Sequence, residues 1–201
     1  MNATTTIPAP ASVWNVTLVG VGGQGTILVS DLLAIAAMEA GHDVKKSEIH
    51  GMSQRGGSVV SQVRFGPLVR SPIIPVGATD LLVAFERTEA LRYAHLARPD
   101  AIVLVNDAER VPVSVSSGAI PPLADADARL RAIPGLRLVP ADALAVQAGN
   151  PKTANVVLLG ALSRFTPIPE DVWQTALTVR VPPRFLDVNR AAFALGRAAL
   201  P

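Results

Sequence analysis

Cysteine is absent from this 201-residue chain. Without a thiolate, the chain cannot form a disulfide, a zinc–thiolate site or a cysteine-ligated iron–sulfur cluster. Aromatic residues are also scarce, at 4% of the sequence, so valine, leucine, isoleucine and alanine must build the core. That composition suits a parallel sheet covered by helices on both faces.

An excess of charge of one sign is missing too. The chain has 18 Lys and Arg residues against 16 Asp and Glu residues, for a net charge of +2. No basic run is interleaved with aromatic residues, so we expect no nucleic-acid partner. No apolar stretch is long enough to span a membrane, and the N-terminus lacks the pattern of a signal peptide. We therefore expect a cytoplasmic protein without membrane association.

Short apolar runs alternate with segments of helical periodicity. Residues 1–12 are rich in Thr, Ala and Pro, which predicts a flexible tail before one domain over residues 13–201. We expect strands at residues 13–19, 42–47, 59–65, 81–85, 102–105 and 136–139, and helices at 24–40, 88–97, 124–133, 141–148, 155–165, 169–178 and 189–200. Residues 68–74 follow a Gly-Pro turn, which favours a returning hairpin arm. The alternation predicts an α/β fold, a single three-layer Rossmann-like domain with a mostly parallel sheet plus a β-hairpin excursion.

The first glycine-rich motif runs from Gly20 to Gly25, directly after an apolar strand and before a helix. In that context glycines let the backbone approach an anion, and the free amides at the helix start supply hydrogen-bond donors. A dinucleotide site also needs an acidic residue at the end of the second strand, and Asp43 and Glu48 bracket that place. The same glycines would also serve tight strand–helix packing without a ligand, with the Gln24 amide ordering the loop.

The second motif covers Glu48 to Gly57 and is predicted to be a loop at the end of a strand, where open α/β sheets bind ligands. Arg55, flanked by glycines, could clamp a phosphate or a carboxylate. His50 is the weak candidate for moving protons, since a lone histidine without a paired nucleophile fits an ordered loop better than a catalytic role. The candidate binding residues of the two motifs are Gly20, Gly22, Gly23, Gln24, Gly25, Glu48, Gly51, Met52, Ser53, Gln54, Arg55, Gly56 and Gly57.

Other polar groups are open to a structural interpretation. Lys45 and Lys46 are expected at a solvent-facing strand end. Glu86, Arg87 and Glu89 follow a strand, and either face the same crevice or begin a helix. A polar turn, Asn150 to Asn155, precedes an apolar helix for which Thr153 is a candidate N-cap. The three histidines have no metal-ligand spacing, so we expect no metal site.

Together, the motifs resemble the gamma subunit, or gamma domain, of 2-oxoacid:ferredoxin oxidoreductases. The resemblance continues through Val63-Arg64-Phe65-Gly66, Ser71-Pro72-Ile73, Ala84-Phe85-Glu86 and Lys152-Thr153-Ala154-Asn155, and reaches Asn189 to Arg197. A separate chain of this length most resembles the small (beta) subunit of the indolepyruvate enzymes. Indolepyruvate, arylpyruvates, branched 2-oxoacids and pyruvate all stay open as substrates, with the aryl class favoured by subunit organisation alone.

The resemblance implies an oxidoreductase subunit that is not active alone. In that family, thiamine diphosphate and coenzyme A take part in oxidative decarboxylation of a 2-oxoacid, and electrons leave through iron–sulfur clusters to ferredoxin. The chain has no cysteine and no Gly-Asp-Gly start of a thiamine-type magnesium motif. The resemblance thus implies a larger partner subunit that holds thiamine diphosphate, Mg²⁺ and the clusters, while this chain completes and shields the active site. The alternative is a stand-alone NAD(P)- or coenzyme A-binding Rossmann-like protein.

Overall fold

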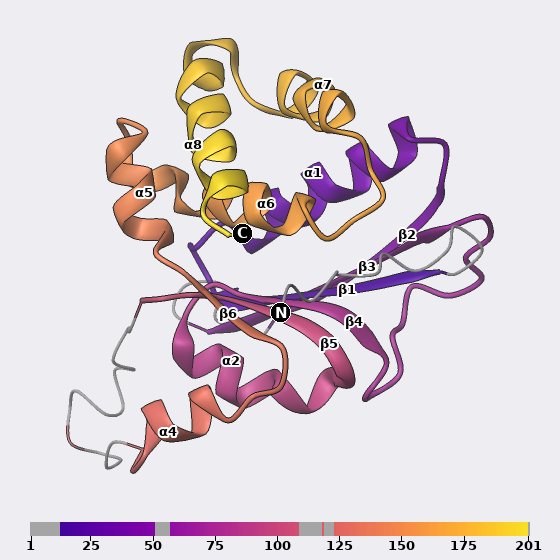
Figure 1. The fold of residues 1–201 in the computed structure, drawn as a ribbon. Coiled ribbons are helices and arrows are strands. Elements are labelled where there is room, and N and C mark those ends of the chain that lie inside the picture. Colours follow the sequence, from indigo (N-terminus) through magenta and orange to yellow (C-terminus); the bar gives the residue numbers. More distant parts are fainter. Residues whose placement is uncertain (1–12, 51–56, 109–117, 119–122, 201) are drawn as a thin grey trace, which may run out of the picture.

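A computed structural model describes residues 13–50, 57–108, 118 and 123–200. Six strands form one sheet in the order β2-β3-β1-β4-β5-β6, and helices cover both faces (Figure 1). The strands are β1 (Trp14–Val21), β2 (Asp43–His50), β3 (Ser58–Gly66), β4 (Thr79–Ala84), β5 (Ala97–Asn106) and β6 (Leu136–Val139). The pairs β1–β4, β4–β5 and β5–β6 are parallel, and β3 runs antiparallel to both neighbours. The prediction of a three-layer α/β fold with a mostly parallel sheet is confirmed.

The helices divide into two layers (Figure 1). On one face lie α1 (Thr26–Glu39), α5 (Ala141–Gln147), α6 (Ala154–Ser163), α7 (Glu170–Arg180) and α8 (Leu186–Ala198). On the other face lie α2 (Arg87–Tyr93) and α4 (Ala126–Arg131). Within the described ranges, short 3₁₀ turns are formed by η1 (Ala94–Leu96), η2 (Pro151–Thr153) and η3 (Pro183–Phe185).

Each face of the sheet has its own core. The larger core packs strand residues such as Leu18 and Val83 against α1 and the C-terminal helices, and fully buries Trp173 and Phe193. The smaller core packs Leu82 and neighbouring strand residues against α2 and α4. Because side chains alternate between the two faces of a strand, the continuous apolar runs of β1, β4 and β5 supply both cores.

The hairpin is not where the sequence predicted it. Residues 67–78 contain no strand, and the hairpin is instead formed by β2 and β3. Pro67, Pro72 and Pro75 have no N–H to donate to a sheet ladder. Side chains of β3 hold this segment instead: Arg64 donates to the carbonyls of Ser71 and Ile73 at 2.9 and 3.0 Å.

Two element boundaries also differ from prediction. β2 continues to His50, so Glu48 belongs to a strand rather than a loop, and Lys45 and Lys46 are not at a strand end. The strand is longer because its pairing with β3 extends through Ile49 and His50, opposite Val60 and Val59. The helix expected at 88–97 ends at Tyr93 and continues as η1, since β5 already begins at Ala97.

Strand connections create a crevice at one end of the sheet. The chain leaves β1 to enter α1 on one face, and leaves the neighbouring β4 to enter α2 on the opposite face (Figure 1). Where adjacent parallel strands lead to opposite faces, their connecting loops diverge and open a ligand crevice at the carboxyl ends. The first glycine motif lies at this point.

Candidate functional site

The first glycine loop is closed by Gln24. The backbone N–H of Gln24 donates to the Val21 carbonyl at 3.0 Å, and the Val21 N–H donates back to the side-chain oxygen of Gln24, Oε1, at 2.7 Å. Gly25 then begins α1 in the left-handed region, with φ of 83°. The Asn155 side chain presses against Gly25, so that a Cβ there would clash with Asn155 Nδ2. The predicted ordering role of Gln24 is confirmed.

Among the described residues, hydrogen-bond donors at the start of α1 have no side-chain acceptor. No side chain caps this end of the helix and no acidic residue lies in its first turn. The Thr26 hydroxyl is buried and makes no hydrogen bond within the described residues. Unsatisfied amides at a helix start favour a negatively charged group.

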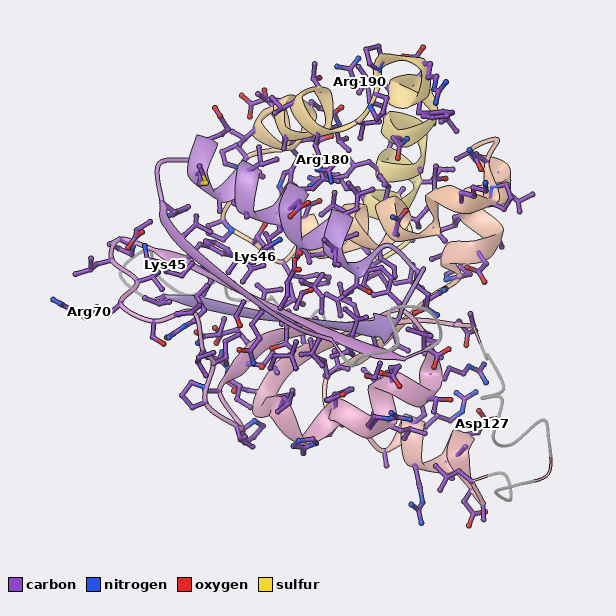
Figure 2. All side chains as sticks on the ribbon, turned by 180° about the vertical axis from the view of Figure 1, so that it is seen from behind. Lys45, Lys46, Arg70, Asp127, Arg180 and Arg190 are labelled. Atoms are coloured by element: carbon purple, nitrogen blue, oxygen red, sulfur yellow. The ribbon has the colours of Figure 1, made fainter. Side chains whose placement is uncertain are left out.

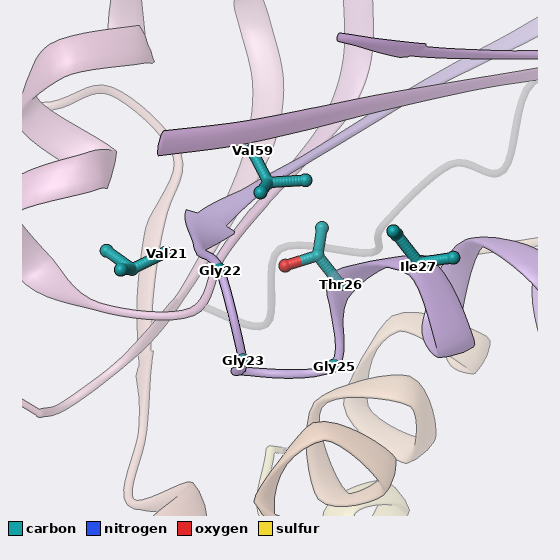
Figure 3. Close-up of a pocket in the computed structure, with 7 residues that line it drawn as sticks. All are labelled: Val21, Gly22, Gly23, Gly25, Thr26, Ile27 and Val59. Carbon is teal, nitrogen blue, oxygen red and sulfur yellow. The ribbon is translucent and has the colours of Figure 1, made fainter. Parts of the chain in front are cut away.

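A cavity of about 310 Å³ opens beside these donors. Figure 3 shows Thr26 and Ile27 of α1 on one side of it, Val59 of β3 on the other, and the glycine loop between them. The Thr26 hydroxyl is directed toward the end of β1, where its oxygen lies buried against Gly20. The cavity thus combines an apolar wall with donors at one end, a combination suited to an apolar ligand with an acceptor group.

The second glycine motif meets the first at this cavity. The Gly22 N–H donates to the Gly57 carbonyl at 2.8 Å. Val59, which lines the cavity, lies opposite His50 in the β2–β3 register. The predicted site residues Gly51, Met52, Ser53, Gln54, Arg55 and Gly56, and the side chain of His50, lie outside the described part of the structure.

Glu48 is part of a row of charges between β2, α1 and α7. Lys46 donates to Asp31 at 2.5 Å and forms an ion pair with Glu48 at 2.6 Å, and Arg180 reaches Asp31 at 3.2 Å. Figure 2 shows Lys46 and Arg180 on this side of the molecule. Burial by itself would lower the pKa of Lys46, but hydrogen bonds to the two carboxylates outweigh it and raise that pKa above 10.5.

These contacts argue against a dinucleotide-type acidic residue. A ribose-binding carboxylate must be available beside the glycine loop, yet Glu48 is engaged by Lys46 and its strand is separated from β1 by β3. Asp43 begins β2, seven positions before its end at His50, where it accepts from Lys45 and from the Val69 N–H.

The polar residues after β4 begin a helix. Arg87 pairs with Asp107 and Asp127 at 2.5 and 2.9 Å, which joins α2 to the end of β5 and to α4. Glu89 is buried and accepts from Ser58 Oγ at 2.5 Å. Of the two interpretations, the helix-starting one accounts for these contacts.

A second hollow of about 340 Å³ lies on the other side of Gly23 and Gln24. Its lining includes Lys152 and Asn155 from the polar turn, which the sequence pattern suggested only as a helix start. The signal that could have found them is the run of amide and ammonium donors, Asn150, Lys152 and Asn155, at the start of a helix that is buried from Asn155 to Ser163.

The described residues contain no cluster of His, Asp and Glu side chains that could hold a metal ion. Nor does any helix in these ranges have the length and apolar content that a membrane crossing requires. The candidate site consists of the glycine loop, amide side chains and Lys152 at the carboxyl ends of the parallel strands, the edge at which open α/β sheets place their ligands.

The family of this chain follows from its full-length similarity. The family model described as pyruvate ferredoxin/flavodoxin oxidoreductase matches residues 15–199. The chain belongs to this family.

Similarity to individual relatives indicates which type of subunit this chain resembles. The chain is 41% identical to "Indolepyruvate oxidoreductase subunit IorB" of Thermococcus kodakarensis, over 91% of this chain and 94% of that one. Its fold is similar to the keto/oxoacid ferredoxin oxidoreductase gamma subunit of Geobacter sulfurreducens, with 25% identity, a TM-score of 0.69, and coverage of 92% and 97%. A 2-oxoglutarate:ferredoxin oxidoreductase of Magnetococcus marinus shares the fold, with 21% identity and a TM-score of 0.70, over 93% of this chain and 31% of that one. The predicted resemblance is confirmed, and the chain is a subunit of a 2-oxoacid:ferredoxin oxidoreductase.

Proposed function

We propose that this chain is the small subunit of an indolepyruvate:ferredoxin oxidoreductase. The observation that carries the proposal is the 41% identity, over almost the whole chain, to an indolepyruvate oxidoreductase subunit. The reaction would be oxidative decarboxylation of an aryl 2-oxoacid, in which the acyl group passes to coenzyme A, carbon dioxide leaves, and ferredoxin accepts the electrons through iron–sulfur clusters.

The redox groups do not fit on this chain. Iron–sulfur clusters are held by cysteine thiolates, and the chain has none. A magnesium–diphosphate motif of the thiamine type starts with Gly-Asp-Gly, which is also missing from the sequence. We therefore assign thiamine diphosphate, Mg²⁺ and the clusters to a larger partner subunit, and expect the complex to be cytoplasmic.

The residues of this chain would bind, orient and exclude water. The two glycine motifs meet at one cavity through the Gly22–Gly57 hydrogen bond, so both would face the partner's active site or the path of coenzyme A. The free amides at the start of α1 suit an acceptor group of the ligand. A subunit seated there would shield a reactive intermediate from water. No side chain of this chain is assigned a proton-transfer role, and His50 stays a prediction.

Affinity purification of the native protein tests the proposal. We expect the chain to copurify with a larger, cysteine-rich polypeptide, the eluate to absorb in the visible range, and indolepyruvate to drive reduction of a ferredoxin substitute when coenzyme A is present. A panel of 2-oxoacids then ranks the substrates. Recovery of a colourless chain that is active by itself would overturn the subunit assignment.

The second candidate is a stand-alone NAD(P)- or coenzyme A-binding protein. Its support is the glycine loop at the start of α1, while the engagement of Glu48 by Lys46 speaks against NAD. Thermal denaturation with NAD, NADP or coenzyme A separates the candidates, because a ligand that binds the isolated folded chain raises its melting temperature.

A further inference from the structure

The hollow beside Gln24 lies at the point where the strand connections diverge. Gln24 belongs to the β1–α1 loop, and Phe85 directly follows β4, and both line the hollow. This is the crevice in which open α/β sheets place ligands. It is separate from the cavity beside Thr26, since the two share only Gly23 of the glycine loop.

Two amide donors in this crevice lack protein partners. Gln24 is oriented by the Val21 N–H, which donates to its Oε1, and the buried Nε2 is left without an acceptor. Asn155 is 8% exposed, and its Oδ1 accepts from the Val156 N–H at 2.9 Å. No acceptor for Asn155 Nδ2 is found in the described ranges. Gln24 therefore leaves a buried donor without an acceptor, which is costly. Asn155, whose Nδ2 lies against Gly25, adds a second amide to the lining of the crevice.

Lys152 adds a positive charge to these donors. It lines the same crevice, and its backbone N–H is held by Asn150 Oδ1 at 3.0 Å. No carboxylate pairs with its ammonium group among the residues that the structure describes. The acidic residue that also lines the crevice, Asp142, accepts from Asn106 Nδ2 at 3.1 Å.

We propose that this crevice is a binding subsite for a phosphoryl group, held by Lys152, Gln24 Nε2 and Asn155 Nδ2. The donors come from three segments, the glycine loop, η2 and α6, and so approach from different directions. Such an arrangement suits the several acceptor oxygens of a phosphoryl group better than a planar carboxylate. The subsite needs only residues of this chain, so it can be tested independently of the subunit proposal.

Calorimetric titration of the full chain with inorganic pyrophosphate, at constant ionic strength, tests the subsite. We expect saturable binding that Lys152→Gln weakens at least tenfold, because the variant loses the charge-assisted hydrogen bond. The isosteric changes Gln24→Glu and Asn155→Asp keep the bonded oxygens but replace each free donor by a carboxylate oxygen, and should abolish binding. Lys45→Gln is the matched control, since Lys45 is an exposed lysine on β2 away from the crevice.

Malonate in place of pyrophosphate tests the ligand class. We expect malonate to bind at least tenfold more weakly, and equal or tighter malonate binding would overturn the phosphoryl assignment. No saturable binding of either anion, or equal pyrophosphate affinities for the Lys152→Gln and Lys45→Gln proteins, would overturn the subsite itself. Nitrogen-resolved NMR of the side-chain amides gives a second readout that needs no variant, because pyrophosphate should shift the Gln24 and Asn155 NH₂ signals.

Discussion

The amide of Gly22 donates a hydrogen bond of 2.8 Å to the carbonyl of Gly57, and so joins two glycine motifs that are about thirty residues apart. The antiparallel pairing of β1 with β3 makes this contact possible, because Val21 lies opposite Ser58 at the ends of the strands. The first motif is thereby held on a frame of backbone hydrogen bonds. Contacts of Asn155 and Ser58 support that frame from its two sides, and each can be tested.

Gly25→Ala should destabilise the chain more than Gly23→Ala. Both glycines have positive φ, of 83° and 101°, and an alanine in such a conformation costs about 1–2 kcal/mol. An added Cβ at Gly25 also meets Asn155, whereas nothing lies within 4 Å of one at Gly23. We expect an extra loss of about 1–3 kcal/mol for Gly25→Ala from this overpacking. Chemical denaturation measures both, and equal losses would show that the Asn155 contact does not constrain the loop.

Ser58→Ala should destabilise the start of β3. Ser58 Oγ donates to Glu89 Oε2 and contacts Tyr93 OH at 2.9 Å, and Glu89 is 2% exposed. Removing the donor leaves a buried carboxylate oxygen poorly satisfied, at a cost of about 1–3 kcal/mol.

Ser47→Ala on β2 is the control for Ser58→Ala, because Ser47 makes no side-chain hydrogen bond within the described residues. It should change stability by less than about 0.5 kcal/mol. If both alanine variants unfold at the same denaturant concentration, the buried carboxylate of Glu89 does not need the hydrogen bond from Ser58.

The contribution of Lys46 to the stability of the fold should persist until strongly alkaline pH. Its folded-state pKa is raised above 10.5 because its hydrogen bonds to Asp31 and Glu48 outweigh the opposing effect of burial. A raised pKa means that the stabilisation is complete below the unfolded-state pKa and is lost as pH rises through the folded-state value. The free energy of unfolding of the wild-type protein should exceed that of Lys46→Gln by about 1 kcal/mol. This difference should be constant from about pH 7 to 10 and should shrink above about pH 10.

Denaturation curves of wild type and Lys46→Gln at several pH values check this expectation. Lys45→Gln serves as the exposed control on the same strand. A difference that already declines between about pH 7 and 9 would contradict a raised Lys46 pKa.

Asp80 should respond to pH in the acidic range. Burial raises the pKa of its carboxyl above 3.8, although the Asn15 N–H and Arg98 partly oppose that effect. With a raised folded-state pKa, protonation favours the folded state, and this stability is lost as pH rises from 3.8 through the raised value. As pH rises through that range, the wild-type protein should therefore lose stability relative to Asp80→Asn.

In the wild-type protein the Asn15 N–H donates to Asp80 Oδ2 at 2.7 Å. An asparagine at position 80 keeps an oxygen that can accept this hydrogen bond. The difference in denaturation midpoint between wild type and Asp80→Asn is the quantity to measure. A difference that is constant across the range, or that changes in the opposite direction, would rule out desolvation as the dominant influence on Asp80.

Much of this protein was determined by its sequence alone. The continuous apolar runs predicted the parallel strands, and the turn-and-helix patterns predicted α5, α6, α7 and α8, because these signals are local and depend on the neighbouring residues. The absence of cysteine excluded clusters from this chain by chemistry that no fold can change. The paired glycine motifs carried the resemblance to the family, which the full-length similarity confirmed.

Tertiary structure decided what depends on residues distant in sequence. The hairpin formed between β2 and β3 rather than after β3. Strand pairing depends on every strand that is available, and three prolines in residues 67–78 lack the N–H groups that a sheet ladder needs. Lys46 became part of a charge row because α1 and α7 bring Asp31 and Arg180 to it. Gln24, Lys152 and Asn155 meet at one crevice because β1 and β4 lead to opposite faces of the sheet, a topology that no local pattern encodes.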